Sequence, residues 1–277
     1  MRKKTVSMLL WVSLIFTCPA YAAIDTRLYA LDCGSLDMHD IASFSDTQFY
    51  SHHPMRLADT CFLIKNPNGW LLWDLGLGDQ YLDHPFEDKK HHTTLTVSHS
   101  LVSQLKQLGL TPNDIQYVAL SHSHFDHTGN AKLFTHATWL LQRSEYQFIQ
   151  QKPLSSAVAD NTFQLLSGVN KILLDGDYDV FGDGTVIILR TPGHTPGHES
   201  LEVVLPHKGV IIISGDLYHM RQSEEFKQVP AFNTSRSETL ASMARIDGVL
   251  HNTHGRLIIQ HDPSDFASLP KIPQYLD

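Results

Sequence analysis

Short apolar runs alternate with polar or Gly/Pro-rich stretches along most of the chain. Four such runs are bounded by polar, Gly or Pro residues and cover residues 116–120, 186–189, 210–213 and 257–260. Runs of this length predict buried β-strands. Residues 60–65 and 70–74 predict two more strands, joined by a hairpin turn with the sequence Asn-Pro-Asn-Gly at residues 66–69.

Two stretches have apolar residues at helical spacing. Residues 97–108 place Leu101, Leu105 and Leu108 on one face, and Gly109 then favours a helix end. Residues 238–250 predict a second helix with an apolar face. The alternation of strands and helices indicates an α/β fold. A chain of 277 residues that is 42% hydrophobic can form one large sandwich domain, and nothing in it indicates a second.

A side chain that can bind metal follows each of the four apolar runs. His122 follows the first run, His194 the second, Asp216 the third and His261 the fourth. Active sites commonly gather at one edge of a sheet, where loops carry the reactive groups on a rigid scaffold. The sequence therefore predicts that these four side chains meet.

The stretch 121–130, with the sequence Ser-His-Ser-His-Phe-Asp-His-Thr-Gly-Asn, holds three imidazoles and a carboxylate within six residues. These are His122, His124, Asp126 and His127. Imidazole and carboxylate suit Zn²⁺ and its neighbours, whereas structural zinc sites are usually closed and rich in thiolates. The motif therefore indicates a catalytic metal site.

Four segments, residues 121–130, 191–194, 214–216 and 260–261, resemble in order the motifs of the metallo-β-lactamase superfamily of binuclear metallohydrolases. The resemblance covers nearly all of residues 23–277 and implies an α/β fold, the four-layer αβ/βα sandwich. It implies two Zn²⁺ ions or other divalent transition metals, with a shared hydroxide as the nucleophile. It assigns His122, His124 and His194 to the first ion, Asp126, His127 and His261 to the second, and Asp216 to both.

Differences within the superfamily narrow the expected reaction. Zinc β-lactamases of the commonest class have a Cys where this chain has Asp216, and glutathione thioesterases carry a C-terminal helical region that the short stretch 262–277 cannot supply. Residues 121–129, 191–201 and 215–219 resemble the N-acyl homoserine lactone lactonases. This implies opening of the lactone ring, with Asp126 assisting proton transfer. The alternatives are a broader ester or β-lactam hydrolase on the same centre and a non-catalytic metal-binding periplasmic protein.

Two neighbouring residues are candidates for the hydrogen-bond donor to the developing oxyanion. In the lactonases a tyrosine lies three residues after the bridging Asp, where this chain has His219, and Tyr218 lies one residue earlier. Tyr218 is favoured because a phenol stays a neutral donor over the working pH range, whereas the charge of imidazole changes near neutrality. The spacing favours His219 instead.

The other histidines have smaller expected roles. His198 is expected to support the site by hydrogen bonding. His251 and His254 are expected at the surface, and five more lie in polar loops, one of which could serve the mouth of the site: His52, His53, His84, His91 and His92. An acyl tail is expected to bind among the loops around residues 36–58, 142–160 and 219–233.

Residues 1–22 have the basic start, apolar centre and small-x-small end of a secretory signal peptide, so the mature chain is expected to be 23–277, periplasmic or secreted. No stable membrane insertion is expected after cleavage. Cys33 and Cys61 could then pair or remain buried thiols. The formal net charge of −8 argues against a nucleic-acid partner and favours a small-molecule substrate. The oligomeric state stays open.

Overall fold

Two β-sheets pack face to face in the computed structural model, which describes residues 25–153, 155, 157–159 and 162–277. The larger sheet has the spatial order β4 (Phe86–Asp88), β5 (Thr93–Thr96), β1 (Arg27–Met38), β2 (Met55–Asn66), β3 (Gly69–Trp73), β6 (Tyr117–Ala119), β7 (Thr138–Gln142), β8 (Lys171–Leu174). The smaller sheet has the order β13 (Arg256–Ile258), β12 (Gly209–Ile213), β11 (Glu199–Leu205), β10 (Val186–Arg190), β9 (Tyr178–Asp179).

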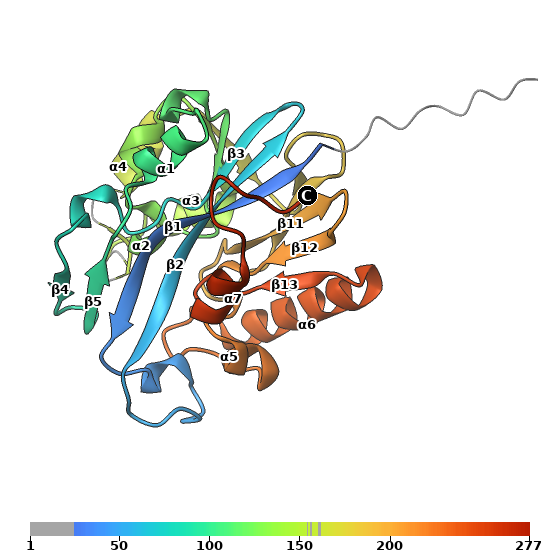
Figure 1. Ribbon diagram of the computed structural model, residues 1–277. Helices are drawn as coiled ribbons and strands as arrows, with labels where there is room; N and C mark the ends of the chain where they lie inside the picture. The colour runs from blue at the N-terminus through green and yellow to red at the C-terminus, as the bar shows by residue number, and fades with distance from the viewer. Residues whose placement is uncertain (1–24, 154, 156, 160–161) are drawn as a thin grey trace, which may run out of the picture.

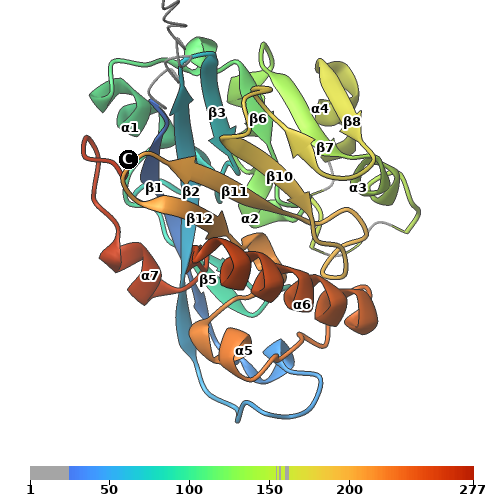
Figure 2. The same cartoon turned by 90° about the vertical axis from the view of Figure 1, so that its right-hand side faces the viewer.

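Helices cover the outer faces of both sheets. The helices of the described residues are α1 (Leu101–Gln107), α2 (Phe125–Thr128), α3 (Arg143–Phe148), α4 (Thr162–Gly168), α5 (Arg221–Glu225), α6 (Arg236–Thr253) and α7 (Pro263–Ser268), of which α1, α3, α4 and α6 pack on the outer faces. In Figure 1, α1 and α4 lie on one side of the strands β1 to β3, and α6 lies on the other side, beyond β13. Figure 2 shows α6 running alongside the smaller sheet. The predicted four-layer α/β sandwich is therefore confirmed.

Three apolar layers hold the sheets and helices together. Between the sheets, Phe62 and Trp73 of the larger sheet pack with Ile188 of the smaller one. The outer face of the larger sheet packs against α1, α3 and α4, and Met243 and Ile246 of α6 pack against the smaller sheet. Because central strands are buried on both faces, their sequences are continuous apolar runs without a polar alternation.

The predicted elements are present, but several of their boundaries differ from the prediction. Residues 60–65 and 70–74 lie in β2 and β3, which pair antiparallel across the predicted turn. The helix expected at 238–250 is α6, and it is longer than predicted. The helix expected at 97–108 begins only at Leu101, because the hydroxyl of Ser100 accepts a hydrogen bond from the Ser103 amide and caps it. Val97 instead pairs with Leu82.

The N-terminal region adds one covalent link. Cys33 of β1 and Cys61 of β2 form a disulfide, which decides between the two states that the sequence left open. The expected signal peptide, residues 1–22, lies outside the described residues. Within the described part of the chain, no helix is long and apolar enough to cross a membrane.

Candidate metal centre

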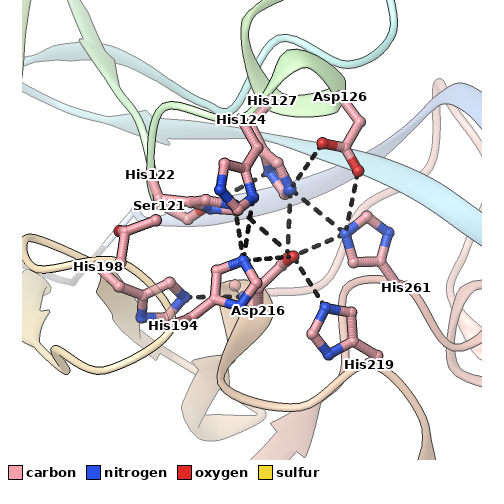
Figure 3. Close-up of polar contacts among 12 residues, drawn as sticks. Ser121, His122, His124, Asp126, His127, His194, His198, Asp216, His219 and His261 are labelled. Carbon is pink, nitrogen blue, oxygen red and sulfur yellow. Dashed lines mark hydrogen bonds and ion pairs between the residues drawn. The ribbon is translucent and has the colours of Figure 1, made fainter. Parts of the chain in front are cut away.

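The seven predicted ligands converge where strands of both sheets end (Figure 3). β3 and β6 run parallel in one sheet, and β12 and β13 run parallel in the other. The segments that follow these strands therefore leave at the same edge. His122 follows β6, and Asp216 and His261 follow β12 and β13.

The first cluster consists of His122, His124, His194 and Asp216, all buried. Nε2 of His194 lies 3.1 Å from Nε2 of His122 and 3.1 Å from Nδ1 of His124. A ring nitrogen facing two others can share a proton with only one of them, so lone pairs converge on this point. Such a convergence of buried imidazoles fits a cation.

The second cluster consists of Asp126, His127 and His261. Nε2 of His261 lies 3.3 Å from Nε2 of His127. The carboxylate of Asp126 lies 3.8 Å from the His127 ring and 3.9 Å from the His261 ring. Asp126 and His127 both lie in the single turn of α2, whose N-cap is His124. The segment after β6 therefore supplies His122 and His124 to the first cluster and Asp126 and His127 to the second.

Asp216 lies between the two clusters. Its Oδ2 is 3.3 Å from Nε2 of His194, and its Oδ1 is 2.9 Å from Nε2 of His261 and 3.2 Å from Nε2 of His127. Oδ1 is buried, yet it forms no hydrogen bond of good geometry with the described residues. Orphaned buried oxygens are costly and rare. A carboxylate with one oxygen facing each cluster fits the bridging role that the resemblance implied, and the residues present fit two ions.

The protonation states of the imidazoles suit metal binding at the first cluster. Burial lowers the pKa of His122 and His194 well below the usual range and that of His124 to about 4. Burial acts in the same direction on His261, but Asp216 outweighs it and raises the pKa of His261 to about 9. Burial favours the acid form of Asp216, whereas the surrounding imidazoles hold its pKa well below the usual range. The first cluster therefore combines neutral imidazoles with an ionised carboxylate, as metal ligation requires. At the second cluster, burial lowers the pKa of His127, but Asp74 and Asp216 outweigh it and raise that pKa well above the usual range, so metal binding there has to displace protons from His127 and His261.

The ring nitrogens that face away from the centre are held by hydrogen bonds. Nδ1 of His194 lies 2.8 Å from Oδ1 of Asn233, and Nδ1 of His261 lies 2.7 Å from the carbonyl oxygen of Ala58. Such bonds fix the tautomer and the orientation of a ligand imidazole. Together they aim Nε2 of both rings into the centre.

Asp74, directly after β3, holds the second cluster in place. Its carboxylate accepts hydrogen bonds from the Ser121 amide at 2.7 Å and the Gln260 side chain at 2.6 Å, and lies 2.9 Å from Nδ1 of His127. The sequence analysis missed this residue. The signal was present, because the predicted strand 70–74 also ends in a possible donor side chain.

His198 supports the centre as predicted. Its Nε2 accepts a hydrogen bond from the Asp216 amide at 2.8 Å, and its Nδ1 lies 2.8 Å from the Thr191 carbonyl oxygen. Burial lowers the pKa of His198 to about 4, so the ring stays neutral and can accept. The turn before Asp216 needs Gly215, whose φ is +54° and whose added Cβ would lie 2.7 Å from Nε2 of His198.

The structure brings His219, not Tyr218, to the centre. Nε2 of His219 lies 3.1 Å from Oδ2 of Asp216. Tyr218 is fully buried on the other side, in the apolar layer under α6, and its hydroxyl lies 3.4 Å from Asp247 and from Lys227. The placement of the two side chains argues against the preference for Tyr218 as oxyanion donor and favours His219, because successive extended residues point in opposite directions.

A cavity of about 290 Å³ opens above the two clusters. Its floor includes His194, Asp216, His219 and His261, and its walls include the apolar side chains of Leu36, Met38, Phe44, Leu57, Phe125 and Phe232. Lining residues come from all three segments expected to hold an acyl tail. His91 also lines the cavity and stacks on Phe125, with the two ring centroids 4.8 Å apart. The other histidines that were expected at the surface or in polar loops are exposed: His52, His53, His84, His92, His251 and His254.

Comparison with known proteins agrees with this geometry. The family model described as "Metallo-beta-lactamase superfamily" matches residues 56–248. The N-acyl homoserine lactonase AttM of Rhizobium radiobacter is 31% identical over 267 residues, which cover 91% of this chain and 98% of the relative.

Two solved structures extend the likeness to the whole fold. A variant of AiiA from B. thuringiensis, with N-decanoyl-L-homoserine bound at its active site, matches with a TM-score of 0.79 and 25% identity, covering 90% of this chain and 98% of that chain. An N-acyl homoserine lactone hydrolase with the product N-hexanoyl-L-homoserine at its catalytic metal centre matches with a TM-score of 0.78 and the same identity and coverage. The chain belongs to the metallo-β-lactamase superfamily.

Proposed function

We propose that the protein is a metal-dependent hydrolase that opens the lactone ring of N-acyl homoserine lactones. The observation that carries this proposal is the apolar cavity directly above the paired clusters, with Asp216 and His219 at its floor. An acyl tail needs an apolar wall, and a lactone carbonyl needs cations and a donor beside it. Two structurally similar proteins support the proposal: an AiiA variant binds N-decanoyl-L-homoserine at its active site, and an N-acyl homoserine lactone hydrolase binds N-hexanoyl-L-homoserine at its catalytic metal centre.

The donor set supports zinc as the native metal. The seven ligands are imidazoles and carboxylates. Zinc binds such ligands in catalytic sites that leave a position open for water or substrate. Other divalent transition metals bind the same ligand types, so the identity of the bound metal also depends on which metals are available in the cell. We therefore propose two Zn²⁺ ions per chain.

Two bound divalent ions would supply a water of lowered pKa as the nucleophile and would stabilise charge on the carbonyl oxygen. The residues of this chain then orient the substrate. His219 donates a hydrogen bond from Nε2 to the carbonyl oxygen of the substrate. Phe44 holds the His219 ring in place by an edge-to-face contact, with the ring centroids 5.0 Å apart. Phe232 and Leu36 lie on the cavity wall and pack against the acyl tail. Asp126, at the floor, accepts or returns a proton as the ring C–O bond breaks.

A substrate panel tests the proposed reaction. Metal-loaded protein is assayed against an acyl homoserine lactone, a chromogenic β-lactam, an aryl ester and a glutathione thioester. We expect the lactone to have the largest kcat/KM, by at least about tenfold, because it alone matches both the apolar wall and the centre. If the aryl ester or the β-lactam has the largest kcat/KM instead, the proposed lactonase activity is wrong and the protein is a broader ester or β-lactam hydrolase. Protein treated with a chelator is the control for metal dependence.

We also propose that the protein is exported. The signal-peptide pattern of residues 1–22 supports this, and so does the Cys33–Cys61 disulfide, since disulfides persist in oxidising compartments. Mass spectrometry of periplasmic or secreted protein should find an N-terminus near Ala23 and a cross-linked peptide pair containing both cysteines. Exported protein that retains Met1 to Ala22 would refute the proposal.

A further inference from the structure

Glu145 is a buried carboxylate close to the metal centre that the mechanism does not use. It is the third residue of α3, directly after β7, and its side chain accepts four hydrogen bonds. All four come from uncharged donors. Burying a carboxylate costs free energy unless hydrogen-bond donors surround both of its oxygens. The four hydrogen bonds of Glu145 are therefore sensitive to any change in its two acceptor oxygens.

The two oxygens of Glu145 hold two different ligand segments. Oε1 accepts hydrogen bonds from the Ser123 amide at 2.9 Å and the Ser123 hydroxyl at 2.6 Å. Ser123 lies between His122 and His124. Oε2 accepts from the Thr195 hydroxyl at 2.7 Å and the Gly197 amide at 3.0 Å, directly after His194. One carboxylate thus joins the segments that carry the three imidazoles of the first cluster.

The backbone around Glu145 is packed against the same turn. A Cβ added to Gly197 would lie 2.3 Å from the Glu145 amide nitrogen, so only glycine permits this approach. The Ser144 hydroxyl donates to the Pro196 carbonyl oxygen at 3.0 Å. The start of α3 is therefore fixed relative to residues 195–197, and the carboxylate has little freedom to follow a displaced ligand segment.

We propose that Glu145 is a positioning residue for the first metal ion, setting the distance between the His122–His124 segment and His194. This inference rests on the two-metal centre of the proposed function but not on the lactone substrate. The second cluster is held by other groups: Asp74 at His127 and the Ala58 carbonyl at His261. The effect of Glu145 should therefore be selective for one ion.

Replacing the carboxylate by its amide isolates this role. Glu145→Gln keeps the size and shape of the side chain, but one of its two acceptor oxygens becomes an NH₂ donor. That group must then face either the Ser123 donors or the Thr195 and Gly197 donors. A hydroxyl can turn and accept from this NH₂ group, but the Ser123 or Gly197 backbone amide can only donate and loses its acceptor, so one ligand segment has to move away. Outer partners of metal ligands typically contribute about 10–100-fold to metal affinity.

The test measures Zn²⁺ binding to the metal-free full-length protein by competition with a chromophoric chelator. We expect Glu145→Gln to weaken one of the two sites by about 10–100-fold and to leave the other within about threefold. The visible spectrum of Co²⁺-loaded protein should change correspondingly at one site. Gln147→Ala, an exposed change on the same helix, is the matched control and should match the wild type.

Three results would overturn the proposal: unchanged affinity at both sites, equal weakening of both, or a lowered Tm without a change in metal binding. If Glu145→Gln fails to fold, Thr195→Val removes a single donor to Oε2 and should still weaken the same site selectively. Failure of the lactonase proposal looks different, because the wild type would then bind two ions and select another substrate in the panel.

Discussion

Replacing Asp216 by alanine should remove the shared carboxylate and lower kcat/KM by about 10³-fold or more. Asp216 is the only described side chain whose two oxygens face the two clusters separately, at 3.3 Å from His194 and 2.9 Å from His261. Losing several kcal/mol of charge stabilisation at a metal centre corresponds to a rate effect of this size. Elemental analysis after dialysis should find two ions in the wild type and fewer in the variant.

His198→Ala is the comparison for this experiment. His198 acts through the Asp216 amide and does not face the ions, so its loss should cost about 10–100-fold. Equal damage from both substitutions would contradict the distinction between ligand and support. Retention of two ions and near-normal turnover by Asp216→Ala would show that the bridge is not needed. Circular dichroism checks that both variants fold.

His219→Ala should lower kcat for the lactone by about 10²–10³-fold, the usual effect of losing one oxyanion donor. The side chain reaches the floor of the cavity and lies 3.1 Å from Asp216. Both ions should stay bound, because seven other side chains supply the ligands. Steady-state kinetics together with metal content measure the two properties separately.

Tyr218→Phe is the matched control, since it alters the neighbouring residue and removes only a hydroxyl. That hydroxyl lies beside Asp247 and Lys227, away from the cavity, so kcat should change by no more than a few-fold. A larger loss in Tyr218→Phe than in His219→Ala would reverse the assignment of the donor. If neither change lowers kcat while the ions remain, the ions alone stabilise the oxyanion.

The sequence by itself determined the α/β fold and the seven side chains that meet at the centre. The fold follows from apolar runs of strand length. Four of the ligands lie within five residues after such a run, and the other three, His124, Asp126 and His127, belong to the histidine-rich stretch 121–130. Because the strands β6, β12 and β13 end at one edge, the position of side chains after strand ends was enough to predict that His122, Asp216 and His261 converge. The helix start at Leu101 was harder to locate, since a cap at Ser100 outweighs the apolar spacing before it.

Only the tertiary structure decided which groups hold those ligands in place. Asp74 and Glu145 act across 53 and 22 residues of sequence separation, respectively, and no local pattern encodes such contacts. The choice of His219 over Tyr218 depends on which face of one short segment turns toward the cavity. The pairing of Cys33 with Cys61 depends on the packing of β1 against β2. Spacing along the chain fixes the identity of the ligands, whereas packing between distant segments fixes their orientation.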